Sequence, residues 1–382
     1  MYQLSHFDIH LFLSEYWQKK PLLIRQAFVD FDDPLDENEL AGLALEEFVD
    51  SRLISLQDKK WTVTHGPYDD INDHCQGAWS LLVQAVDQYS PEADELMRAF
   101  SFIPHWRMTD LMVSFSNQGA GVGPHIDQYD VFIVQGKGSR RWQVGLPGQY
   151  DTISPHADLK QISHFSPIID EILKPGDMIY IPPHHPHNGV ALEDCMNYSV
   201  GFRAPSTQEM LAAFSDFVLD NNLFTQRYAD QVVETRNMPG EIKQQEVAQF
   251  KQLLHQALDS PECTQWLTKY LSENNRISQQ DAEFEQAYSV DEISQLLLEG
   301  TTFVRAPGIK AIFTEQHLTE NKAFIFYIEG QQFSVASHSA EFVQNFLNSA
   351  VFTPQYPIKS DICLFFTQTL TTLVNSGYWF PE

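Results

Sequence analysis

The stretch 119–142, GAGVGPHIDQYDVFIVQGKGSRRW, constrains what this chain can fold into more than any other. At its centre, His125 and Asp127 are separated by a single residue. Alternate side chains of an extended strand lie on the same face, so the imidazole and the carboxylate should point the same way. The glycines that precede the pair allow backbone and ligand to approach closely. The stretch therefore predicts half of a metal site, with the other half on a later strand.

Histidines that follow a second β-type run are the candidates for the missing ligand. The segment 177–187, DMIYIPPHHPH, reads as a strand, a turn bounded by prolines, and a histidine at the start of the next strand. His184, His185 and His187 all compete for the role. We select His187, because it begins the following apolar run, and we expect the other two to be solvated in the turn. Two histidines and one carboxylate on one face of a metal form the facial triad of non-haem Fe(II) oxygenases, which leaves positions open for a 2-oxo acid and dioxygen (O2).

A dicarboxylate cosubstrate also needs a cation at its far end. Arginine suits this role because its guanidinium binds a carboxylate through two parallel hydrogen bonds. Arg140 and Arg141 are adjacent on the next predicted strand, so only one of them can face inward. We select Arg140, which shares a strand face with Trp142 and Val144. The alternative for Arg140 is a surface salt bridge.

Three neutral polar residues are further candidates for binding the cosubstrate. Ser114 and Ser116 share one face of the strand that precedes the glycine-rich run. Either serine is placed to donate to the same carboxylate as Arg140, and the sequence does not decide between them. Asn197, on a later strand, is a candidate for the end near the metal. The alternative for all three is ordinary hydrogen bonding within the sheet.

The order of predicted elements indicates an α+β chain with a β-rich centre. The first part carries predicted helices at 36–47, 79–86 and 91–100 and a hairpin with strands at 52–54 and 61–63. Short β-type runs punctuated by turns then predict a sandwich or barrel; they lie at 111–116, 131–135, 141–144, 178–181 and 198–202. Helices are expected at 207–221, 241–258 and around 266–271. Their apolar stripes indicate either internal packing or a subunit interface.

The remaining residues predict a linker and a small C-terminal domain. Residues 272–286 are polar and read as a linker. Beyond them, a helix, a strand, a hairpin around Glu329-Gly330 and two further helices suggest a winged helix. Winged helices often bind nucleic acid, but lysine and arginine are scarce here. A structural or protein-contact role is therefore expected.

Composition and charge exclude several classes of protein. The 382 residues carry a formal net charge of −27, which argues against direct nucleic-acid binding and suits a basic partner. The four cysteines are far apart and fit a reducing cytosol. No secretory signal pattern opens the sequence and no apolar run is long enough to cross a bilayer, so no membrane role is expected. These features predict a cytoplasmic protein.

Several long motifs make the chain recognisable. The chain resembles the Jumonji-C (JmjC, cupin-like) 2-oxoglutarate oxygenases, and among them the bacterial ribosomal oxygenases, nearly from end to end. The motifs that carry the resemblance are YWQKKPLLIR (16–25), ENELAGLALE (37–46), WSLLVQAVD (79–87), GPHIDQYDVFIVQG (123–136), PGDMIYIPP (175–183), NYSVGFRAP (197–205) and LVNSGYWF (373–380).

The resemblance implies an architecture and a set of site residues. It implies a double-stranded β-helix (jelly-roll) core in a JmjC catalytic domain over 1–205, with an N-terminal helical and strand extension. It also implies a helical dimerisation domain over 206–272 and a winged-helix-like domain over 287–382. The family's iron ligands correspond to His125, Asp127 and His187, and its cosubstrate arginine corresponds to Arg140.

The same resemblance implies a reaction and leaves alternatives open. It implies Fe(II)- and 2-oxoglutarate-dependent hydroxylation of an arginyl residue of a large-subunit (50S) ribosomal protein by a homodimer, coupled to decarboxylation of 2-oxoglutarate to succinate and CO2. Asp130 is one candidate to receive the guanidinium. A protein histidyl hydroxylase or a lysine demethylase on the same fold remains possible from sequence. A metal-binding cupin that does not catalyse is the third alternative, and a cation placed for the 2-oxo acid disfavours it.

Overall fold

The computed structural model describes most of the chain. The described residues are 2–230, 235–273, 287–314, 323–336, 339–354 and 360–382. Most of the predicted linker, 274–286, lies outside them. The chain divides into two compact units: the first holds the described residues of Met1–Ala204, Asn274–Ile309 and Asn348–Glu382, and the second holds those of Pro205–Glu273 and Lys310–Leu347.

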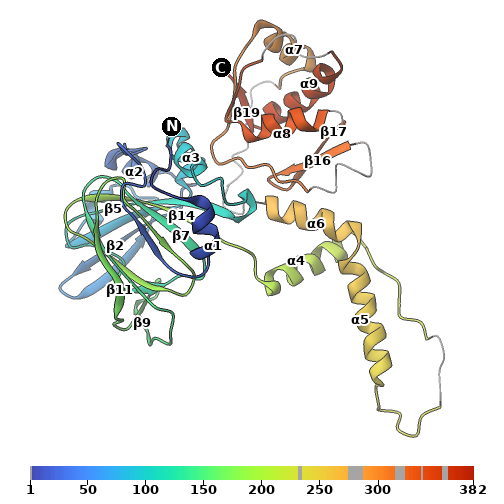
Figure 1. The fold of residues 1–382 in the computed structure, drawn as a ribbon, viewed down its shortest axis with the longest axis horizontal. Helices are drawn as coiled ribbons and strands as arrows, with labels where there is room; N and C mark the ends of the chain where they lie inside the picture. Colours follow the sequence, from blue (N-terminus) through green and yellow to red (C-terminus); the bar gives the residue numbers. More distant parts are fainter. Residues whose placement is uncertain (1, 231–234, 274–286, 315–322, 337–338, 355–359) are drawn as a thin grey trace. The chain divides into compact units, whose positions relative to one another are not determined.

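Two antiparallel sheets dominate the first unit (Figure 1). The larger has the strand order β1 (Leu22–Ile24), β12 (Met178–Ile181), β7 (Asp130–Gln135), β14 (Cys195–Phe202), β5 (Met108–Ser116), β4 (Ala78–Val83), β2 (Ser51–Gln57) and β3 (Lys60–His65). The smaller has the order β11 (Pro167–Leu173), β8 (Arg140–Gly145), β13 (Pro186–Ala191) and β6 (His125–Ile126). A hairpin of β9 (Thr152–His156) and β10 (Leu159–Ile162) forms a third, two-stranded sheet. The predicted β-rich centre is thus confirmed.

The central strands of the larger sheet bury one face in an aromatic core and turn the other toward a cavity. On β7, Phe132 and Val134 point into an aromatic core, whereas Val131 and Ile133 point into a cavity on the opposite side. Strands β14, β5, β4 and β2 alternate in the same way. The core side is completed by α1 (Ile9–Glu15), α2 (Glu37–Leu43) and α3 (Pro91–Arg98), and short 3-10 turns η1 (Ile71–His74), η2 (Val86–Gln88) and η3 (His105–Arg107) connect the strands. Each large apolar side chain buried there contributes about 1.5–3 kcal/mol.

The prediction of a helix at 79–86 is wrong. Residues Ala78–Val83 form strand β4, which pairs with β2 and β5. Leu81 and Val83 enter the aromatic core, while Ser80 and Leu82 line the cavity. A strand that is covered on both faces has a continuous apolar run and does not alternate, so its sequence resembles that of a buried helix.

Three helices form the first part of the second unit. They are α4 (Thr207–Asp220), α5 (Gln244–Leu258) and α6 (Pro261–Ser272). Ser206 caps α4, because its hydroxyl accepts from the Glu209 backbone N–H while the Glu209 carboxylate accepts from the Ser206 backbone N–H. Phe214 of α4 packs against Cys263 and Trp266 of α6. Helix α5 buries no residue.

The C-terminal elements appear in the predicted order. They are α7 (Val290–Glu299), β15 (Phe303–Arg305), β16 (Ala323–Ile328), β17 (Gln331–Ala336), α8 (Ala340–Asn348), β18 (Val351–Phe352), α9 (Ser360–Asn375) and β19 (Trp379–Pro381). The hairpin β16–β17 turns at Glu329 and Gly330, which both have positive φ, as this type of tight turn requires. Strands β18 and β19, which flank β15, were not predicted. Among the described residues, no helix is both long and apolar enough to cross a membrane.

Candidate metal and cosubstrate site

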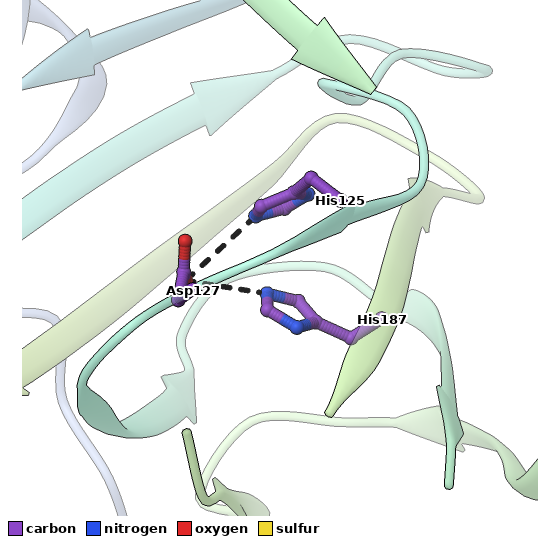
Figure 2. Close-up of side chains that lie close together, drawn as sticks. All are labelled: His125, Asp127 and His187. Carbon is purple, nitrogen blue, oxygen red and sulfur yellow. Dashed lines mark ion pairs between the residues drawn. The ribbon is translucent and has the colours of Figure 1, made fainter. Parts of the chain in front are cut away.

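Three potential metal ligands converge at one end of the smaller sheet. Strands β6 and β13 pair so that His125 lies directly opposite His187, and Asp127 follows β6 immediately. The Asp127 Oδ2 atom lies 3.8 Å from His125 Nε2 and 3.5 Å from His187 Nε2. One ligand atom from each residue lies within 4.8 Å of the others. Figure 2 shows the three side chains pointing toward one another from two separate strands.

Backbone carbonyls fix the tautomers of both histidines. The Nδ1 atom of His125 lies 2.9 Å from the Gly123 carbonyl oxygen, and that of His187 lies 3.0 Å from the His185 carbonyl oxygen. A carbonyl can only accept, so each Nδ1 donates. In its neutral form each ring then presents the Nε2 lone pair to a metal, an arrangement typical of histidine ligands. Gly123 reaches this geometry with φ +81°, where a side chain would also meet Gln161.

The electrostatics of the three residues favour binding of a cation. Burial and the neighbouring His187 lower the pKa of His125 to about 4, so this ring is neutral at physiological pH. Burial raises the pKa of Asp127, but the hydrogen bond from His187 and the charges of both imidazoles outweigh it and lower that pKa to about 2. Burial lowers the pKa of His187, but Asp127 opposes it and the net effect is a raised pKa. A metal ion would take the place of the proton that His187 shares with Asp127.

The other two histidines of the turn point elsewhere. His184 is exposed with φ +66°, and its backbone N–H donates to the Asp127 carbonyl. The expectation that His185 is solvated is wrong, because only 5% of it is exposed and its Nδ1 lies 3.2 Å from the Pro183 carbonyl oxygen. Its own carbonyl accepts from His187, so His185 orients a candidate ligand through its backbone.

A cavity of about 370 Å³ extends from the three ligands between the two sheets. Its inner wall combines apolar side chains with a few polar ones, as is usual for small-molecule sites. The lining includes His125, Asp127, His187, Arg140, Trp142, Ser114, Asn197, Leu82, Met112, Val131 and Ile133. The structure thus brings most of the residues predicted from sequence into one cavity.

Arg140 lies inside this cavity, and Arg141 lies outside. Only 4% of Arg140 is exposed, whereas Arg141 is exposed and pairs with Asp170 at 2.6 Å. Within the described part of the chain, the Arg140 guanidinium donates only to neutral oxygens: to Ser116 at 3.3 Å, to Asn197 at 3.0 Å and to the Gly189 carbonyl at 3.2 Å. Its Nε has no hydrogen-bond partner among the described residues. A buried cation without a carboxylate partner is costly unless an anion binds beside it.

A glycine creates the space for this guanidinium. A Cβ atom at position 189 would lie 2.8 Å from Arg140 Nε and 2.8 Å from the ring of Trp142. Gly189 pairs directly with Trp142 across strands β13 and β8, so it cannot move away. The Trp142 ring in turn lies 5.2 Å from the Arg140 guanidinium, at cation–π distance.

The remaining predicted residues surround Arg140 in different ways. Ser114 and Asn197 both line the cavity and lie opposite each other on β5 and β14. Ser116 is fully buried behind them, where its hydroxyl lies 2.7 Å from that of Ser80. The side-chain amide of Asn197 donates to Gln135 at 2.8 Å, which leaves its oxygen for Arg140. Asn197 is thus placed against the guanidinium.

Asp130 is not available to a substrate guanidinium, and this prediction is wrong. The residue is fully buried and its carboxylate accepts from Arg107 at 3.0 Å, Tyr180 at 2.5 Å and Gln18 at 3.0 Å. It shares a face of β7 with Phe132 and Val134, opposite to the face that Val131 and Ile133 turn toward the cavity. Asp130 therefore belongs to the core side of the sheet.

Sequence reasoning missed several residues of the site. Gln135 orients Asn197, His185 orients His187, and Arg52 lines the outer part of the cavity. Strand alternation from Val131 and Ile133 places Gln135 on the cavity face, so that signal was present. No local sequence pattern indicates Arg52, because this residue reaches the cavity only through the pairing of β2 with β4 and of β4 with β5.

The residues present fit an Fe(II) ion and a 2-oxo dicarboxylate. Two imidazoles and a carboxylate match the ligand set of non-haem iron oxygenases. The Arg140 guanidinium, which has no carboxylate partner among the described residues, matches the far carboxylate of the cosubstrate, since Arg binds carboxylates in a forked geometry. The volume of the cavity is within the range of small-molecule sites.

Comparisons with known proteins agree with this geometry. A family model described as the JmjC domain matches residues 95–210. The ribosomal protein uL16 3-hydroxylase of Escherichia coli strain K12 is 43% identical over 373 residues, which cover 97% of this chain and 97% of the relative. The probable ribosomal oxygenase of Haemophilus influenzae is 32% identical over 326 residues, which cover 82% of this chain and 80% of the relative.

A solved structure is also similar over the full length. The ribosomal oxygenase YcfD from Escherichia coli, in complex with cobalt and 2-oxoglutarate, matches with a TM-score of 0.89 and 40% sequence identity. The match covers 100% of both chains. The similarity therefore includes the sheets, the cavity and the segments that carry the three candidate ligands.

Proposed function

We propose that this chain, which belongs to the JmjC-domain family of ribosomal oxygenases, hydroxylates an arginyl residue of the large-subunit ribosomal protein uL16. The reaction depends on Fe(II), 2-oxoglutarate and O2, and it is coupled to decarboxylation of 2-oxoglutarate to succinate and CO2. The observation that carries the proposal is a two-histidine, one-carboxylate cluster in the same cavity as a buried arginine that has no carboxylate partner among the described residues.

Some residues of the cavity would bind the metal and the cosubstrate, and others exclude water. A bound Fe(II) ion would supply the activation of O2 that oxidation of an unactivated C–H bond requires. His125, Asp127 and His187 would hold this ion through their two imidazole nitrogens and one carboxylate oxygen. Arg140 fixes the far carboxylate of 2-oxoglutarate, with Ser114, Ser116 and Asn197 as its polar surroundings. The apolar side chains on β4, β5 and β7 exclude water from the reacting atoms.

The charge of the chain supports a basic protein substrate. A formal net charge of −27 attracts cationic proteins and speeds their encounter. Charge alone does not select arginine over lysine or histidine, so the arginyl assignment rests on the family. Demethylation of lysine and hydroxylation of histidine remain the alternatives on this fold. A cupin that binds metal without catalysis would not require a buried Arg140 cation placed to bind a 2-oxo acid.

Incubation of purified protein with Fe(II), ascorbate, 2-oxoglutarate and uL16 tests the proposal. Mass spectrometry should find one added oxygen atom on an arginyl residue, together with succinate in equal amount. The oxygen should be absent when 2-oxoglutarate is omitted. Oxygen on a histidyl residue, or loss of methyl groups from lysine, would replace the arginyl assignment with one of the alternatives.

We also infer a domain organisation and an assembly. Residues 1–205 form the JmjC catalytic domain, 206–272 the helical dimerisation domain and 287–382 the winged-helix-like domain, which contacts protein and not nucleic acid. The support for a homodimer is helix α5, whose exposed side chains Val247, Phe250, Leu254 and Leu258 recur at helical spacing on one face. An exposed apolar stripe of this kind is typical of an interface. A cytoplasmic location follows from a ribosomal protein substrate.

Leu254→Glu should convert the proposed dimer into monomers. Leu254 is 69% exposed in the single chain, and burial against a partner would contribute about 1.5–3 kcal/mol for each copy. Light scattering at micromolar concentration should give a dimeric mass for the unmodified protein and a monomeric mass for the variant. Gln252→Glu, on the opposite face of α5, is the matched control and should stay dimeric. A monomeric mass for the unmodified protein would contradict the proposed assembly.

A further inference from the structure

Arg52 is a second arginine in the same cavity. It lies on β2, where alternation turns Arg52 and Ile54 toward the cavity and Leu53 toward the aromatic core. The exposed members of the lining mark the mouth, and they are Tyr129, Ala157, Asp158 and Lys160. Arg52 is only partly buried, so it lies closer to the mouth than Arg140 does.

The Arg52 side chain has no protein partner in the described part of the chain. Its Nε atom is buried without a hydrogen bond, and no ion pair involves its guanidinium. Of the described residues, two with carboxylates line the cavity, Asp127 and Asp158. Asp127 contacts the two candidate histidine ligands, and Asp158 at the mouth lies 3.5 Å from His65 and 3.7 Å from His156. An arginine held this way is ready to donate to a ligand.

Charge balance within the loaded site makes Arg52 a surplus cation. A divalent metal, the Asp127 carboxylate, a 2-oxo dicarboxylate and Arg140 together carry no net charge. Arg52 is therefore not needed to neutralise the cosubstrate. Arg52 lines the same cavity as the three candidate metal ligands, His125, Asp127 and His187. A partner for Arg52 must come from another molecule, and it must be an acceptor.

We propose that Arg52 donates hydrogen bonds to main-chain carbonyl oxygens of the polypeptide substrate as it crosses the mouth of the cavity. This inference rests on the proposed function, because it requires that the substrate is a protein. A side chain that reaches the three ligands brings its own backbone to the mouth, and an extended backbone there has unpaired carbonyls. The guanidinium has five N–H donors in a fixed fork, which suits two neighbouring acceptors. Arg52 would thus fix the register of the polypeptide relative to the metal.

A carbonyl fits better than an acidic side chain as the acceptor. The substrate class favoured by the charge of the chain is basic, so an acid beside the target residue is not its defining feature. Every polypeptide presents carbonyls, whatever its sequence. Specificity then arises from geometry, because Arg52 admits a backbone that runs at a fixed distance from the three ligands.

Arg52→Met tests this role against uL16 with the full-length protein. Methionine keeps much of the apolar stem and removes every donor. We expect kcat/KM for uL16 to fall roughly tenfold to a hundredfold, as for loss of hydrogen bonds to a charged group. The KM for 2-oxoglutarate should not change, because Arg140 provides that contact. Arg52→Lys retains the charge but not the forked arrangement of donors, and it should lower kcat/KM for uL16 less. Lys60→Met removes an exposed cation from the same hairpin and should retain unmodified kinetics.

Other outcomes separate the possible errors. A raised KM for 2-oxoglutarate in Arg52→Met, or an unchanged kcat/KM for uL16, would overturn this inference while the proposed function stands. A protein that leaves uL16 unmodified before any substitution would overturn the proposed function itself, and this inference with it. A peptide from uL16 with every Asp and Glu replaced by Asn and Gln decides the acceptor. The effect of Arg52→Met should persist on that peptide, and its disappearance would identify an acidic side chain instead.

Discussion

Asp127→Ala should abolish 2-oxoglutarate-dependent hydroxylation. The carboxylate is the one anionic member of the three-ligand cluster, and its Oδ2 lies within 4 Å of both Nε2 atoms. Without it, two neutral imidazoles remain and neither the charge nor the geometry of the facial set is retained. Loss of an outer hydrogen-bond partner of a metal ligand typically costs about 10–100-fold, so loss of a ligand should exceed a hundredfold. Succinate formation and Co(II) binding are the two measurements.

Asp170→Ala is the matched control for this substitution. Asp170 also carries a carboxylate on the smaller sheet, but it pairs with Arg141 on the surface. Its removal should cost at most about 1 kcal/mol of stability and leave turnover unchanged. Both variants should unfold near the temperature of the unmodified protein. A wild-type rate of succinate formation by Asp127→Ala would contradict the assignment of the metal ligands.

Arg140→Met should raise the KM for 2-oxoglutarate strongly. The guanidinium is buried and, among the residues that the structure describes, donates only to neutral oxygens, so a bound carboxylate would supply a charged partner. Truncation of one member of a buried, hydrogen-bonded charge pair costs on the order of 2–5 kcal/mol. The KM should therefore rise by roughly 30-fold or more at 1.4 kcal/mol per factor of ten. Titration of 2-oxoglutarate against the rate of succinate formation measures the change.

Arg141→Met provides the comparison within the same strand. Arg141 is exposed and paired with Asp170, so its loss should leave the KM for 2-oxoglutarate unaltered. The two substitutions remove the same group from adjacent positions with opposite orientation. A large rise in KM for Arg141→Met, with none for Arg140→Met, would contradict the role given to Arg140.

Strand alternation accounts for what the sequence could predict of the site. It placed His125 and Asp127 on one face, and it turned Arg140 inward and Arg141 outward, as the structure has them. These predictions depend on neighbours within one strand, where the two-residue period leaves little choice. His187 was distinguished from the other two histidines of its turn because it begins a strand.

The wrong or missing predictions concern features that neighbours along one strand do not determine. Strand β4 was predicted as a helix because both of its faces are covered, so its sequence does not alternate. Asp130 is a candidate to receive the substrate guanidinium in the sequence, but its position on β7 turns its side chain into the core. Arg52 was overlooked because two steps of strand pairing, from β2 to β4 and from β4 to β5, bring it to the cavity. Long-range pairing of this kind is set by the whole sheet and leaves no local signal.

The mass of uL16 from a strain that lacks this chain tests the central claim most directly. Ribosomal proteins from the deletion strain and from its parent are digested and compared by mass spectrometry. We predict that uL16 from the parent carries one additional oxygen atom on a single arginyl residue, and that the deletion strain lacks it. Complementation with the unmodified chain should restore the oxygen, and complementation with Asp127→Ala should not. Identical uL16 masses in both strains, or an oxygen that maps to a histidyl residue, would contradict the arginyl hydroxylase proposed for this protein.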